Sequence, residues 1–259
     1  MNEDLGNGMK AIGAFTVIGD VFSGTTAVGE FRSYNSFVGL AGEFGSVKLG
    51  SNWSPLFLAS TISDATGRWG STNLANPGEL QTANSITYTS PSMSGFSVSF
   101  QRELGIAGTS AAGASFINTG GGAAQAYSLN YSIGGFNAAY AAGTGADTRL
   151  SPALTGTHDA VKTSILAASY NFGVATVHYG NMVTDAAVPG TNAKTNAIGV
   201  SAPVGALTVS AIYSSDGTDN AQNYQGVYAL SKRTAMYLNN GKANAATAAV
   251  TTIGIKHAF

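Results

Sequence analysis

A two-residue alternation of apolar and polar side chains constrains the fold of this chain more than any other feature. Residues 127–133 read YSLNYSI, and residues 96–101 read FSVSFQ. Residues 207–213 read LTVSAIY and follow the same period except at Ile212. Successive side chains of a β-strand point to opposite faces, so each of these segments is predicted to be a strand with one apolar and one polar face.

About fourteen such strands are predicted along the chain. They cover residues 9–19, 31–42, 45–53, 84–90, 95–104, 124–133, 136–144, 162–172, 174–183, 196–204, 206–215, 223–232, 234–242 and 249–259. Short connections, such as the one at 134–135, alternate with long ones, such as 54–83 and 105–123. This alternation predicts an all-β, up-and-down antiparallel meander.

The shortage of charge bears on where such a sheet can reside. Charged residues make up 10% of the 259 residues, although the hydrophobic fraction is 44%. Soluble sheets normally place charges on the wet face, whereas strands of about ten residues fit a transmembrane barrel. Aromatic residues next to the short connections fit the girdle of such a barrel at Tyr88, Phe96, Phe136, Tyr170 and Phe172. A transmembrane β-barrel is favoured, and a soluble β-sandwich or solenoid is the alternative.

The composition also argues against several chemistries. The chain has no cysteine, three histidines and a formal net charge of −1. Disulfides and thiolate sites are therefore excluded, and neither a multi-histidine metal site nor a nucleic-acid-binding surface is expected. His158 precedes Asp159 in a long loop and is expected to be exposed, while His178 is expected to be a solvated spectator on a polar face. No cofactor and no enzymatic activity are predicted.

Six segments resemble the Gram-negative general porin family, in its Neisseria-like and betaproteobacterial branch. They occur in the family's order over nearly the whole chain, and they are EDLGNGMKA (3–11), SFVGLAGEFGSVKLG (36–50), NSITYTSPSMSGFSVSFQ (84–101), ASYNFG (168–173), YALSKRTAMY (228–237) and GIKHAF (254–259). The resemblance implies a single sixteen-stranded barrel domain over residues 1–259, assembled as a homotrimer in the outer membrane. It also implies passive diffusion of small hydrophilic solutes and ions through a water-filled channel.

The first matched segment implies that part of the barrel is absent. EDLGNG resembles the turn between the family's second and third strands. The chain would then lack the signal peptide and the first two strands, and the fourteen predicted strands together with these two would make the family's sixteen. We expect truncation rather than a natural fourteen-stranded barrel.

The loop at 54–83 occupies the position of the family's third loop, which folds into the pore as a constriction. The resemblance implies that Asp64, Arg68 and Glu79 lie at this constriction. Charge rings near a constriction discriminate between ions. The alternative for these side chains is an ordinary solvated surface loop.

The opposing basic wall differs from the family pattern. Lys48 and Lys256 lie on the polar sides of their strands by alternation, and Lys10 and Arg32 are weaker candidates for the wall. Positions at which relatives often carry arginine are occupied by Tyr34, Ser51, Gln81 and Thr87. Weak ion selectivity is therefore expected.

The end of the last strand resembles the assembly signal of outer-membrane barrels, and the alternative is that it is simply a last strand. It ends in Phe259, with His257 and Ile255 at the preceding alternate positions. This ending implies recognition by the barrel-assembly machinery and insertion among outer-membrane lipid and lipopolysaccharide. The loop at 20–30 resembles the position of the trimer latch.

Two other functions are left open by the sequence. A non-conducting adhesin or surface-antigen barrel is compatible with the long loops rich in Ala, Gly, Ser and Thr at 105–123 and 145–161. An outer-membrane hydrolase would need a serine, a histidine and an acid or amide group close together, and the sequence shows no such spacing.

Overall fold

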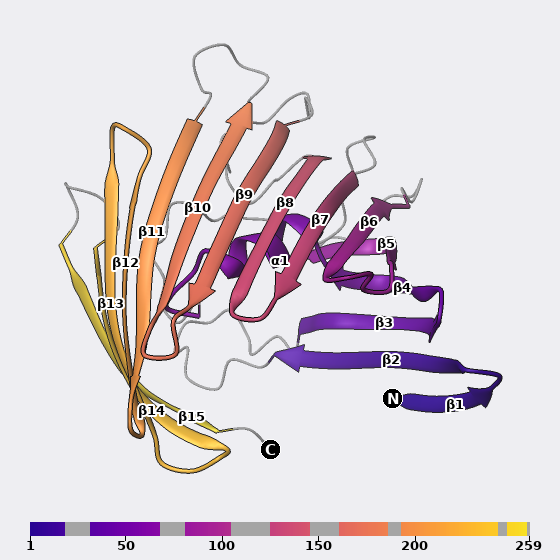
Figure 1. Ribbon diagram of the computed structural model, residues 1–259, viewed down its shortest axis with the longest axis horizontal. Helices are drawn as coiled ribbons and strands as arrows, with labels where there is room; N and C mark the ends of the chain where they lie inside the picture. The colour runs from indigo at the N-terminus through magenta and orange to yellow at the C-terminus, as the bar shows by residue number, and fades with distance from the viewer. Residues whose placement is uncertain are drawn as a thin grey trace.

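The computed structural model describes residues 1–18, 32–67, 81–104, 125–145, 161–185, 193–242 and 248–257. These residues form one large curved sheet and one short helix (Figure 1). No helix in the described part of the chain is long and apolar enough to cross a membrane.

The sheet has fifteen strands, each paired antiparallel with its neighbours in chain order. They are β1 (Asn2–Gly6), β2 (Met9–Ile18), β3 (Arg32–Gly42), β4 (Gly45–Trp53), β5 (Gln81–Thr89), β6 (Phe96–Glu103), β7 (Gln125–Ile133), β8 (Phe136–Gly145), β9 (Val161–Asn171), β10 (Thr176–Asp185), β11 (Ala193–Val204), β12 (Leu207–Ser215), β13 (Asn220–Ala229), β14 (Thr234–Lys242) and β15 (Val250–His257). The all-β, up-and-down antiparallel meander is confirmed, and the predicted strands coincide with β2 to β15.

The additional strand is β1, so the expected number of about fourteen strands was one too few. Residues 2–6 pair with β2, and the turn itself is Gly6-Asn7-Gly8, in which all three residues have positive φ angles of 79°, 52° and 74°. Glycine and asparagine adopt this region most readily, which explains the tight reversal. The described strands leave the sheet open between β1 and β15, which are its two edges (Figure 1).

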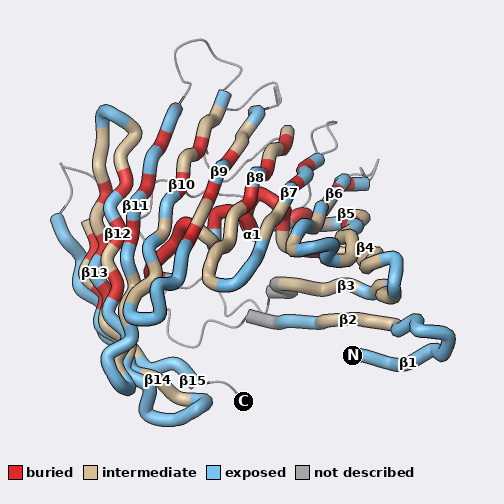
Figure 2. Tube along the Cα trace, viewed as in Figure 1, coloured by how far each residue is buried: buried red, intermediate tan, exposed pale blue. Residues whose placement is uncertain are grey.

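The two faces of the sheet differ sharply in chemistry. Partners in adjacent antiparallel strands lie on the same face, so Leu129 shares its face with Tyr140 and Leu166. These three side chains are 45–49% exposed. Ala141 and Ile165, on the opposite face of the same strands, are fully buried. We call the first face the outer face and the second the inner face. The red stretches of Figure 2 show how the buried residues alternate with the exposed ones.

Aromatic side chains on the outer face gather at the end of the sheet that carries the short connections. The rings of Phe96 and Tyr131 lie 4.3 Å apart, and those of Tyr170 and Phe172 lie 4.6 Å apart. Tyr88 donates a hydrogen bond from its hydroxyl to the carbonyl oxygen of Phe44 at 2.9 Å. The tyrosine rings are amphipathic and the phenylalanine rings pack beside them, an arrangement that suits the boundary between hydrocarbon and water, as the sequence predicted.

Candidate functional site

The site lies on the inner face, where one segment of the chain leaves the sheet and returns across it. This segment contains the helix α1 (Pro55–Ile62), which follows directly on β4. We call residues 54–66 the inner segment. It is the first part of the loop that was predicted at 54–83; the structure shows a helix at its start, and β5 already begins at Gln81.

Local chemistry explains why a helix forms here. Ser54 is the N-cap residue, and its hydroxyl oxygen accepts a hydrogen bond from the backbone N–H of Phe57 at 3.0 Å. Pro55 occupies the first helical position, where its missing N–H costs nothing. The ring of Phe57 stacks on Trp53 at 4.5 Å. A helix of eight residues is too short to be stable in water, so its stability must come from packing.

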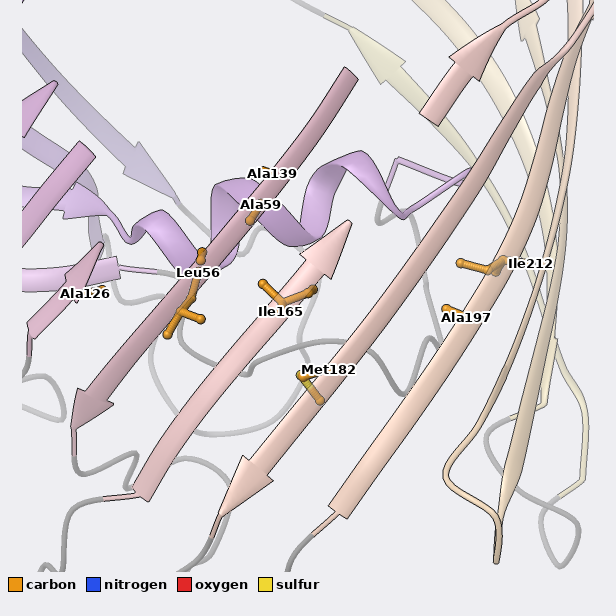
Figure 3. Close-up of a cluster of buried hydrophobic side chains, with 9 residues drawn as sticks. Leu56, Ala59, Ala126, Ala139, Ile165, Met182, Ala197 and Ile212 are labelled. Atoms are coloured by element: carbon orange, nitrogen blue, oxygen red, sulfur yellow. The ribbon is translucent and has the colours of Figure 1, made fainter. Parts of the chain in front are cut away.

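The helix packs on the strands β7 to β10. Leu56 and Ala59 are 3% and 1% exposed, and they join a cluster of buried apolar side chains on the inner face (Figure 3). The other members of this cluster are Ala126, Ala139, Ala141, Ile165, Met182, Ala197 and Ile212. Leu58 is 48% exposed, so the opposite side of α1 faces away from the inner face of the sheet, which we also call the wall.

Glycines on three strands make room for the inner segment. A Cβ atom at Gly180 would lie 2.6 Å from the Cβ of Ser63, and one at Gly199 would lie 2.7 Å from the Cβ of Ala65. One at Gly143 would lie 2.8 Å from the backbone carbonyl oxygen of Gln125 in β7 and 2.9 Å from a methyl carbon of Leu56. Since real Cβ contacts are longer than 3.0 Å, any larger residue at these positions would collide with the segment. We call Gly143, Gly180 and Gly199 the glycine track.

Hydrogen bonds from the wall hold both ends of α1. Before the helix, the amide nitrogen of Gln101 donates to the carbonyl oxygen of Trp53 at 3.3 Å. At its last residue, Nδ1 of His178 lies 2.8 Å from the carbonyl oxygen of Ile62, and Nε2 lies 3.2 Å from the hydroxyl of Ser201. The expectation that His178 is a solvated spectator was wrong, because its side chain is partly buried and both ring nitrogens have hydrogen-bond partners.

Of the residues predicted at the constriction, Asp64 is described. It is 6% exposed, and one carboxylate oxygen accepts hydrogen bonds from the backbone N–H of Thr66 at 2.9 Å and from its hydroxyl at 2.7 Å. The carboxylate therefore stabilises the turn that follows α1. Arg68 and Glu79 lie outside the described residues.

The structure places the predicted basic residues on the sheet. Lys48 pairs with Thr87, which is 7% exposed and on the inner face, so Lys48 shares that face. Its ammonium nitrogen lies 4.8 Å from the ring centroid of Phe37. Register also puts Lys10 and Lys256 on the inner face, opposite Ala41 and Ala235. Arg32 begins β3, and its side chain is not described.

The predicted assembly residues lie on the edge strand β15. Ile255 is 68% exposed on the outer face. His257 follows on the same face, and its Nδ1 lies 2.9 Å from the hydroxyl of Thr234. Phe259 lies outside the described residues, as do His158 and the loop at 20–30.

The glycine track and the two residues that hold the ends of α1 were not predicted from the sequence. A usable signal was present, because an isolated glycine inside a strand often marks the close approach of another backbone. Gly143, Gly180 and Gly199 each interrupt a strand. Nothing local identifies the segment that fills the space, because Ile62 and His178 are 116 positions apart.

Comparison with known proteins agrees with this geometry. The family model described as Gram-negative porin matches residues 1–247. The anion-selective porin of Comamonas acidovorans has a similar structure, with a TM-score of 0.69 and 24% identity over 100% of this chain and 87% of that chain. OmpF of Salmonella typhi, in complex with daunomycin, gives a TM-score of 0.78 and 13% identity over 99% of this chain and 87% of that one. A trimer form of OmpT from Vibrio cholerae gives a TM-score of 0.60 and 12% identity over 98% and 87%. A search of curated proteins by sequence returned no match.

Proposed function

The chain belongs to the Gram-negative porin family, and we propose that the inner segment is the constriction of the channel that this family forms across the outer membrane. Members of the family are channels for passive diffusion rather than enzymes. The proposal therefore concerns which residues of this chain set the width and charge of the channel.

The observation that supports it is the position of α1 on the inner face. The outer face is rich in exposed Leu, Val, Ile and Tyr side chains, as a lipid-facing surface requires. The inner face carries small or polar side chains, among them the buried Ser128, Gln225 and Asn223, and polar side chains on this face fit a barrel interior rather than a contact with lipid. A segment attached to that face occupies part of the lumen and narrows it.

The charges of the lumen are nearly balanced, which supports weak ion selectivity. Register places the carboxylates of Asp4 and Glu103 on the inner face, where they accompany the lysines described above. Asp64 lies in the inner segment itself. Among the described residues, the inner face of the sheet thus carries Lys10, Lys48 and Lys256 together with Asp4 and Glu103, and Asp4 lies directly opposite Lys10 on the neighbouring strand. We further propose that Arg68 and Glu79 contribute to the constriction and that Arg32 contributes to the basic wall.

Assembly and insertion are a separate part of the proposal. We propose a homotrimer, in line with the trimer form known for the similar V. cholerae protein. The exposed apolar outer face would contact lipid and lipopolysaccharide. The C-terminal strand would be read by the barrel-assembly machinery through Ile255, His257 and Phe259.

Planar-bilayer recording of the refolded protein under a salt gradient tests this function. Stepwise conductance with a small reversal potential is expected. A strongly selective reversal potential would contradict the charge assignment. A well-formed trimer that does not conduct would instead favour the adhesin or surface-antigen alternative.

A further inference from the structure

His178 lies where the end of α1 meets the wall. It is on the inner face of β10, between Ser169 of β9 and Gly199 of β11. Its side chain is partly buried, and both ring nitrogens have partners, one in the inner segment and one on the wall. The imidazole therefore bridges the two.

The chemistry of the partners determines which nitrogen carries hydrogen. The carbonyl oxygen of Ile62 accepts only, so Nδ1 must be the donor. In a neutral imidazole Nε2 is then the acceptor, and the hydroxyl of Ser201 donates to it. In a protonated imidazole Nε2 donates, and the same hydroxyl oxygen accepts. The bond to Ile62 is thus available in both protonation states.

The position of Ile62 makes this bond important. Ile62 is the last residue of α1, and the final carbonyl groups of a helix lack partners within it. A donor at this end satisfies such a carbonyl and opposes the negative end of the helix dipole. Immediately beyond Ile62, Ser63 and Ala65 lie over Gly180 and Gly199, so the same point also brings the segment onto the glycine track.

We propose that His178 is a positioning residue that holds the inner segment on the glycine track and so sets the width of the channel. The inference rests on the proposed function, because it assigns a role within that constriction. The donor at Nδ1 acts on the end of α1, and Ser201 orients the ring that carries it.

A single-cysteine reporter tests the attachment without relying on conductance. The natural chain has no cysteine, so Ser60→Cys introduces a unique thiol. Ser60 belongs to α1 and is fully buried in the attached segment. A charged, water-soluble methanethiosulfonate reagent should label this thiol slowly while the segment stays on the wall.

Three variants in this reporter background separate the donor from the ring. His178→Ala removes the donor and should raise the labelling rate roughly fivefold, the factor that corresponds to one lost hydrogen bond. It should also raise single-channel conductance and open-channel noise. His178→Asn keeps an N–H at the position of Nδ1 and should restore slow labelling. Ser201→Ala removes only the partner of Nε2 and should have a small effect.

The outcomes decide between the possibilities. Unchanged labelling and conductance in His178→Ala would overturn the proposal, and so would an Asn variant that behaves like the Ala variant. Asn239→Ala, on β14, is the control for any general loosening of the inner face, and it should label at the parental rate. If labelling depends on His178 while every variant fails to conduct, the attachment stands and the proposed channel function fails.

Discussion

Replacing Gly180 with alanine should force the inner segment off the wall. The new Cβ would lie 2.6 Å from the Cβ of Ser63, whereas ordinary contacts begin at 3.4 Å. Ser63 would have to move by about 0.8 Å to reach that contact. If Ile62 moves with it, the 2.8 Å bond to His178 lengthens to about 3.6 Å, which is beyond hydrogen-bonding range.

The free-energy cost follows from these two changes. Overpacking a filled space costs about 1–3 kcal/mol, and a lost hydrogen bond adds about 1 kcal/mol. The attached state should therefore lose at least about 2 kcal/mol, which corresponds to a roughly 30-fold change in the docking equilibrium.

The assay compares labelling of the Ser60→Cys thiol and single-channel conductance in refolded protein. Gly226→Ala is the matched control, because its Cβ would meet only Leu207 at 3.7 Å, an ordinary contact. We expect faster labelling and noisier, larger conductance for Gly180→Ala, and parental behaviour for Gly226→Ala. Equal labelling rates in the two variants would refute the reasoning, because they would show that the glycine track does not determine how closely the inner segment packs against the wall.

Three further predictions concern charge, the loop side and assembly. Lys48→Glu changes the lumen by two charges, which in water alters the energy of a monovalent ion about 8 Å away by about 1 kcal/mol, in opposite directions for a cation and an anion. The cation-to-anion permeability ratio should therefore rise by up to roughly 30-fold at low salt, and an unchanged reversal potential would place Lys48 away from the ion path. Hydrogen bonds from the backbone N–H groups of Asp219 and Thr218 lower the pKa of Asp216 in the turn after β12. The carboxylate therefore stabilises the turn at pH values above its unfolded pKa, and this stabilisation is lost as pH falls through the lower folded pKa. Amide exchange at Thr218 should stay slow at pH values just below the ordinary aspartate pKa, and it should become fast in Asp216→Ala at neutral pH. Deleting Phe259 should reduce insertion and trimer yield more than the lost contact area of one side chain explains. Heat-modified migration in gels measures the assembled fraction, and an unchanged fraction would show that Phe259 is not part of an assembly signal.

Much of the fold is local, and this is why the alternation revealed it. Tyr127, Leu129 and Tyr131 point one way and Ser128 and Asn130 the other, because the pleat of a strand requires it whatever the neighbouring strands are. The short turns lie where glycine or polar residues interrupt the alternation. The strand β1 was missed because its five residues, NEDLG, show little alternation.

The site could be predicted less well, since its contacts are long-range. The position of the loop came from resemblance, and the helix within it was not expected. Asp64 was predicted at the constriction from its place in the loop, but its hydrogen bonds with Thr66 could not be read from the sequence. Such a choice depends on which groups are near after the segment has packed.

Pattern and composition were sufficient to establish the strands, their two faces and the aromatic belt, because each depends on neighbours a few residues apart. Folding in space was needed to bring α1 onto the inner face, to match Gly180 with Ser63, and to place His178 against Ile62. The last two contacts join residues more than a hundred positions apart, and complementary shape together with one hydrogen bond at the helix end selects them.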